Sequence, residues 1–153
     1  MGFVVTGDQA TPRELLRTAD QLLGGEVSNT QGLWPRAVAF LIRLALERAV
    51  DELLDHEEPA MRAVQVRSAK IICLPRYADA KVAAQVAYLW HELSRATHYQ
   101  AYDLAPTAVE LRRWHSEVAE LVQLMGAVST ERLKSMPART RDIAVHRPQA
   151  DSA

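Results

Sequence analysis

With 153 residues, 48% of them apolar, the chain is long enough for one domain with a buried core. Its formal net charge of −1 argues against a protein that coats nucleic acid by bulk electrostatics, although its 18 Lys and Arg side chains leave room for a local basic patch. The single cysteine, Cys73, excludes an internal disulfide, and the lack of a signal peptide or of an apolar run of roughly 20 residues favours a cytoplasmic protein outside the membrane.

The first predicted helix carries signals at both of its ends. Thr11 precedes a proline that is tolerated at the first helical position, and Glu14 stands where it can close a capping box with Thr11. Leucine and alanine then recur at helical spacing until Gly24 and Gly25 end the segment. We therefore predict an amphipathic helix between these signals.

The second predicted helix, over residues 35–57, is apolar around well over half of its circumference. A helix of this kind is usually buried from several sides, so we predict that it is the central helix of a bundle. Only a narrow strip of its surface is charged, and this strip holds Arg36, Arg43 and Glu47.

Three further helices follow along the chain. The third is predicted over residues 59–74 and the fourth over residues 78–101. The fifth begins with a second capping box, formed by Thr107 and Glu110. Its apolar residues alternate in steps of three and four, as in antiparallel bundles; they are Leu111, Trp114, Val118, Leu121 and Met125.

These elements predict an all-α fold, a bundle of four or five helices that occupies residues 11–126. Residues 1–10 are expected to form a flexible N-terminus, and residues 127–153 a short helix followed by a basic mobile tail. The chain has no glycine-rich phosphate loop and no histidine placed three residues after a glutamate, so we predict neither a cofactor nor a metal site.

The fourth helix contains the pattern that is most informative about function. On a helical wheel, five polar or aromatic side chains spaced three or four residues apart share one stripe roughly 80° wide. They are Tyr88, His91, Arg95, His98 and Tyr102. Apolar residues lie on the opposite side of the helix, so we expect the stripe to face solvent or a partner.

This stripe has two interpretations. An arginine can hold a phosphate and a histidine can move protons near neutral pH, so Arg95 with His98 or His91 as the base would suit a metal-independent ribonuclease. Tyr88, Tyr102 and Arg95 would then contact the ligand. In the other interpretation the histidines and tyrosines line a subunit interface or cap turns that face solvent.

Two segments of the chain resemble the HEPN superfamily of helical domains. Residues 34–50, WPRAVAFLIRLALERAV, are similar to the alanine-rich core helix of that superfamily. Residues 88–111, with LSRA at 93–96 and APTA at 105–108, are similar to actinobacterial members. Both segments lie within residues 11–126, and the resemblance implies a bundle of four or five helices that forms a homodimer.

The resemblance also bears on activity. In active members an arginine and a histidine separated by four to six residues meet across the dimer and cut RNA without metal. Other members bind nucleotides, RNA or proteins, often in toxin–antitoxin or phage-defence systems. Here Ala96 follows Arg95 and His98 comes after only two intervening residues, whereas the pair Arg141 and His146 has the family spacing but lies in the predicted tail.

We therefore predict a HEPN-like dimeric module that is non-catalytic, binds a partner protein, and contacts RNA or a nucleotide through the stripe. One alternative is a divergent metal-independent endoribonuclease of the toxin or phage-defence type. The other is a helical adaptor that binds protein alone.

Overall fold

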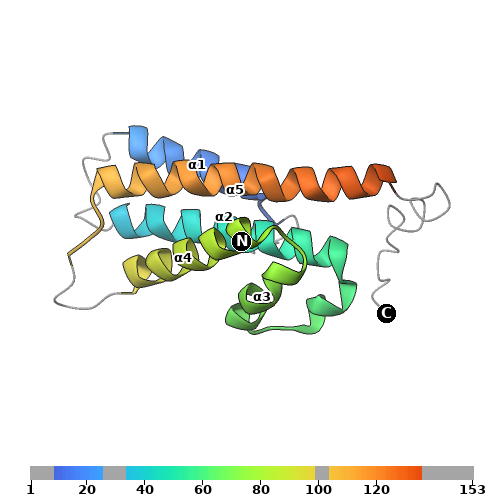
Figure 1. The fold of residues 1–153 in the computed structure, drawn as a ribbon. Coiled ribbons are helices and arrows are strands. Elements are labelled where there is room, and N and C mark those ends of the chain that lie inside the picture. Colours follow the sequence, from blue (N-terminus) through green and yellow to red (C-terminus); the bar gives the residue numbers. More distant parts are fainter. Residues whose placement is uncertain (1–8, 26–33, 99–103, 136–153) are drawn as a thin grey trace, which may run out of the picture.

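The computed structural model describes residues 9–25, 34–98 and 104–135, except for the side chains of residues 132 and 133, and every regular element in this part of the chain is helical (Figure 1). The elements are α1 (Pro12–Gly24), α2 (Trp34–Glu57), the 3-10 helix η1 (Pro59–Ala63), α3 (Arg67–Cys73), the 3-10 helix η2 (Leu74–Arg76), α4 (Ala80–Thr97) and α5 (Ala108–Ser135). The predicted all-α bundle is confirmed for these residues.

Both predicted capping boxes are present. At the start of α1 the backbone N–H of Glu14 donates to the Thr11 hydroxyl at 3.3 Å, and the Thr11 N–H donates to the Glu14 carboxylate at 2.8 Å. Thr107 and Glu110 make the same exchange at the start of α5. Bonds from the backbone and hydroxyl of the two threonines lower the pKa of both glutamates, so each box is complete only while its carboxylate is ionised.

Helix α2 lies at the centre of the bundle, as predicted. It packs against α1, α4 and α5, which surround it (Figure 1). Its buried apolar residues are therefore spread over several sides of the helix; they are Val38, Ala39, Ile42, Ala45, Leu46, Ala49, Val50, Leu53 and Leu54. Burial of each large aliphatic side chain contributes about 1.5–3 kcal/mol to folding.

Helix α5 supplies the facing seam of the core. All five residues predicted for this seam, from Leu111 to Met125, are buried. The helix continues without a break to Ser135 and so runs past residue 126. The predicted N-terminal segment and tail, over residues 1–8 and 136–153, lie outside the described residues.

The third helix was predicted as one continuous helix over residues 59–74, and this prediction is wrong. A 3-10 turn occupies residues 59–63, extended backbone follows, and α3 begins only at Arg67. The side chains of Arg67 and Lys70 both reach Asp51 on α2, so a tertiary contact sets the place of α3 rather than a local start signal.

Among the helices that the structure describes, none combines the length and the apolarity that a membrane crossing requires.

Candidate functional site

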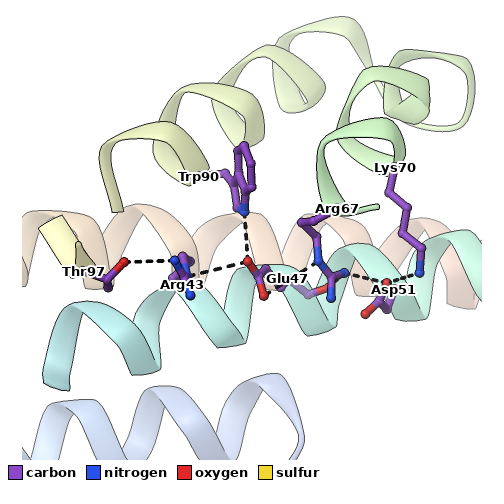
Figure 2. A network of polar contacts seen from close by, with 7 residues as sticks. All are labelled: Arg43, Glu47, Asp51, Arg67, Lys70, Trp90 and Thr97. Atoms are coloured by element: carbon purple, nitrogen blue, oxygen red, sulfur yellow. Dashed lines mark hydrogen bonds and ion pairs between the residues drawn. The ribbon is translucent and has the colours of Figure 1, made fainter. Parts of the chain in front are cut away.

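The charged strip of α2 is half-buried and faces α3 and α4 (Figure 2). Arg43 donates to the Thr97 hydroxyl at 2.9 Å, and the indole N–H of Trp90 donates to the Glu47 carboxylate at 2.9 Å. Arg43 and Glu47 also form an ion pair at 3.6 Å. Helix α4 is therefore tied to α2 at two points along its length, and these contacts fix its rotation.

A second part of the network ties α3 to α2 (Figure 2). Asp51 accepts from Arg67 Nη1 and from Lys70 Nζ, both at 2.7 Å, and Arg67 Nε lies 3.8 Å from Glu47. Lys70 is only 9% exposed. Burial alone would raise the pKa of Asp51, but its hydrogen bonds to Arg67 and Lys70 and their positive charges outweigh this effect and lower the pKa.

Sequence reasoning did not identify this network as a unit. The predicted charged strip of α2 included Arg43 and Glu47 but not Asp51, which follows Glu47 at the same spacing of four. The partners Arg67, Lys70 and Trp90 come from other helices and carry no local signal. Since the charged groups of the network are held by one another, we assign them to positioning α3 and α4.

A further arginine of the same strip binds the C-terminal end of α4. Arg36 Nη1 donates to the main-chain carbonyls of Ala96, at 3.3 Å, and of His98, at 2.9 Å. A cation that binds the last carbonyls of a helix satisfies groups that lack intrahelical partners and favours helix termination. His98 accordingly has extended backbone, with φ −76° and ψ 123°.

The predicted stripe is therefore only partly correct. Tyr88, His91 and Arg95 lie on one exposed side of α4, opposite the buried core residues of that helix. His98 is not on this helical face, because α4 ends one residue earlier, at Thr97, and not at residue 101. Tyr102 lies outside the described residues, as does the pair Arg141 and His146.

The three side chains that share the α4 face are open to solvent. Tyr88 is 55% exposed, and the Arg95 side chain is 71% exposed. Arg95 lies 3.4 Å from Glu92, one turn earlier on α4. His91 is exposed as well, and its ring makes no hydrogen bond or ion pair with another described residue.

A hollow of about 590 Å³ opens beside Arg95, between the end of α4 and the start of α5. Its charged lining is balanced, with two arginines, Arg36 and Arg95, and two glutamates, Glu92 and Glu110. Trp114 forms part of the wall; its indole N–H is buried and has no hydrogen-bond partner. The arrangement suits contacts of both signs and does not form a continuous positive surface.

Two other histidines, His56 and His115, each make a polar contact. His56 Nδ1 lies 3.3 Å from Glu57 at the end of α2, and His115 Nε2 lies 2.9 Å from the Leu16 carbonyl of α1. His115 thus lies at the edge of the core. No cluster of three or more potential metal ligands occurs among the described residues.

Comparisons with models of protein families, with curated proteins and with solved structures gave no match for this chain. The interpretation of the site therefore depends on its own geometry.

Proposed function

We propose that this chain is a HEPN-like, dimeric and non-catalytic module that binds a partner protein through the exposed face of α4. The observation that supports it most is the position of Tyr88, His91 and Arg95, which project together from a helix whose rotation is fixed by half-buried polar contacts. Tyrosine and arginine are the residue types that contribute most to protein interfaces.

The geometry supports binding in preference to catalysis. A general base acts from a fixed position, within hydrogen-bond reach of the proton that it removes and oriented by its neighbours. The His91 ring has no such neighbour among the described residues, and His98 has left the helical face that carries Arg95. A preorganised arginine–histidine pair is thus lacking on α4.

The charges favour a protein partner over RNA. RNA binding requires a positive surface that follows the phosphates, and its strength falls steeply with salt. Around the hollow beside Arg95, however, each of the two arginines is matched by a glutamate. A protein surface with charges of both signs fits this lining better than a polyanion does.

The first test is RNA cleavage by the purified chain in EDTA. The proposal predicts no cleavage above the buffer control. Cleavage that persists without metal and disappears in both Arg95→Ala and His91→Ala would instead establish the endoribonuclease, the second candidate function.

The second test measures partner binding directly. A protein that is retained by the wild-type chain should be purified and its affinity measured by calorimetry at two salt concentrations. We expect Tyr88→Ala and Arg95→Ala to weaken binding about tenfold or more. Gln85→Ala is the matched control, because Gln85 is also exposed on α4 but lies off the face formed by the three residues. Equal affinity of all these variants would overturn the proposal.

A further inference from the structure

The C-terminal half of α5 has a face that no other described helix covers. Helix α1 lies alongside only the N-terminal half of α5 (Figure 1). Beyond it, exposed residues recur on one side of α5; they are Glu120, Gln123, Leu124, Ala127, Thr130, Glu131 and Lys134. We call this set the α5 face. It includes Leu124, a large apolar side chain that is 52% exposed.

Part of the α5 face is itself hollowed, because Gln123, Ala127, Thr130, Glu131 and Lys134 line a cavity. A cavity of about 580 Å³ lies between the start of α1 and residues 122–134, and another of about 250 Å³ lies between α2 and α5. Gly126 lines both cavities, and a Cβ atom placed on it would meet nothing within 4 Å. Among the described residues, packing therefore leaves space along this half of α5.

We propose that the α5 face binds the same face of a second copy of this chain, with the two helices antiparallel and a two-fold axis at Ala127. The inference rests on the dimer that is part of the proposed function and names the surface that forms it. In a two-fold contact each residue a given number of positions before the axis faces the residue the same number of positions after it.

This symmetry pairs the side chains of the α5 face in a complementary way. Glu120 faces Lys134 of the second copy, because each lies seven residues, or two helical turns, from Ala127. Gln123 faces Glu131 of the second copy, so an amide meets a carboxylate. Leu124 faces the methyl group of Thr130 of the second copy. At the axis two alanines meet, and their small size lets the helices approach closely.

The complementarity selects a second copy as the occupant. Both members of the pair Glu120 and Lys134 are present on one face, so two copies form two opposite-charge contacts and no like-charge contact between these residues. The shared segment, residues 120–134, is only about 22 Å long. An interface of this length is at the small end of specific contacts, so we expect a dimer with a dissociation constant in roughly the micromolar range.

A charge exchange tests the register. The dissociation constant of each variant should be measured by sedimentation equilibrium. Glu120→Lys and Lys134→Glu should each raise it about tenfold, because each change places two like-charge pairs in the interface. The double variant should recover the wild-type value. Lys81→Glu, an exposed charge on α4, is the control and should leave dimerisation unchanged.

Cross-linking provides an independent test of the axis. In a Cys73→Ser background, Ala127→Cys should form a disulfide-linked dimer on mild oxidation, because residues at a two-fold axis approach within disulfide distance. Ser116→Cys is exposed on the same helix but far from the axis, and it should not link. Equal linking of both variants would overturn the proposal.

The outcomes also separate this inference from the proposed function. A dimer that is insensitive to both single charge variants but weakened by Tyr88→Ala would overturn the α5 interface and leave the dimeric module intact. A chain that stays monomeric at all concentrations would overturn the inference together with the dimer. Binding of a partner protein through α4 is measured separately and would not be affected.

Discussion

Asp51 is the residue on which the attachment of α3 to α2 depends most. Its carboxylate binds both Arg67 and Lys70, and its lowered pKa means that folding favours the ionised form. Replacement by asparagine should leave Lys70 without its counter-charge and Arg67 with only the more distant Glu47, and cost about 1–3 kcal/mol of unfolding free energy at pH 7. Urea unfolding at pH 7 measures this loss.

The pH dependence of stability follows from the same shift. Because the pKa of Asp51 is lower in the folded than in the unfolded protein, its contribution is complete above the unfolded value, about 3.9, and is lost as the pH falls through the folded value. Asp51→Asn should therefore flatten the loss of stability in acid. Glu52→Gln is the control with the opposite sign, because burial raises the pKa of Glu52 and ionisation there opposes folding. Equal pH profiles for wild type and Asp51→Asn would contradict this assignment.

The sequence could predict this residue-scale chemistry only in part. The spacing of Arg43 and Glu47 indicates a charged strip on one side of α2, but a strip of charge on a helix is usually solvated. Its partial burial follows from α3 and α4 packing over it, which brings Arg67 and Trp90 to it from 20 and 43 residues away in sequence. Local pattern contains no information about contacts at such separations.

At the scale of elements, Gly126 tests what stabilises α5. It lies inside this helix, where glycine is less favourable than alanine because more backbone entropy is lost, and no neighbour would meet an added Cβ atom. Gly126→Ala should raise the unfolding free energy of the monomer by about 0.5–1 kcal/mol. Thermal unfolding at low concentration measures the change.

Gly24 provides the comparison for this prediction. It is the last residue of α1, and an added Cβ atom there would also meet nothing within 4 Å. Since helix ends fray, Gly24→Ala should give a smaller gain than Gly126→Ala. A loss of stability in Gly126→Ala would mean that the glycine serves the folded chain in some other way.

Some helix ends are set by residues close in sequence, and others by contacts with another helix. The starts of α1 and α5 could be predicted because threonine and glutamate at a spacing of three satisfy the first N–H groups within four residues. The end of α4 could not be predicted in this way, because its last carbonyls are bound by Arg36, which lies on α2, 60 residues before Ala96. This difference also decided the site, since the wheel that placed His98 beside Arg95 assumed a helix to residue 101.

At the scale of the whole molecule, periodicity was sufficient for the fold. The four long helices contribute to one core, and the residues that fill it recur at helical spacing in the sequence. Function depends instead on a few exposed side chains, on which folding places little constraint. The exposed face of α4 could therefore be located from the sequence, whereas the structure was needed to show which of the predicted residues lie on it.

The protein should unfold in two stages, because its segments contribute unequal numbers of side chains to the core. In the segment from Pro59 to Arg76, Leu74 is the only fully buried residue of the common core; Asp51 anchors α3, and Arg62 of η1 pairs with Asp55 at 3.1 Å. Such a segment should unfold locally at a lower free energy than the bundle. We expect amides of α3 to exchange with solvent roughly tenfold or more faster than those at the centre of α2.

Hydrogen exchange followed by mass spectrometry tests this order of opening. The variant Lys70→Ala should speed exchange in α3 further, because one of the two anchoring cations is lost, while exchange at the centre of α2 should stay within experimental error of wild type. Lys81→Ala, at an exposed position of α4, is the control and should change neither rate. If α3 and α2 exchange at the same rate and respond together to Lys70→Ala, the described helices unfold as one unit, and the polar network then belongs to the same cooperative core as the apolar residues around α2.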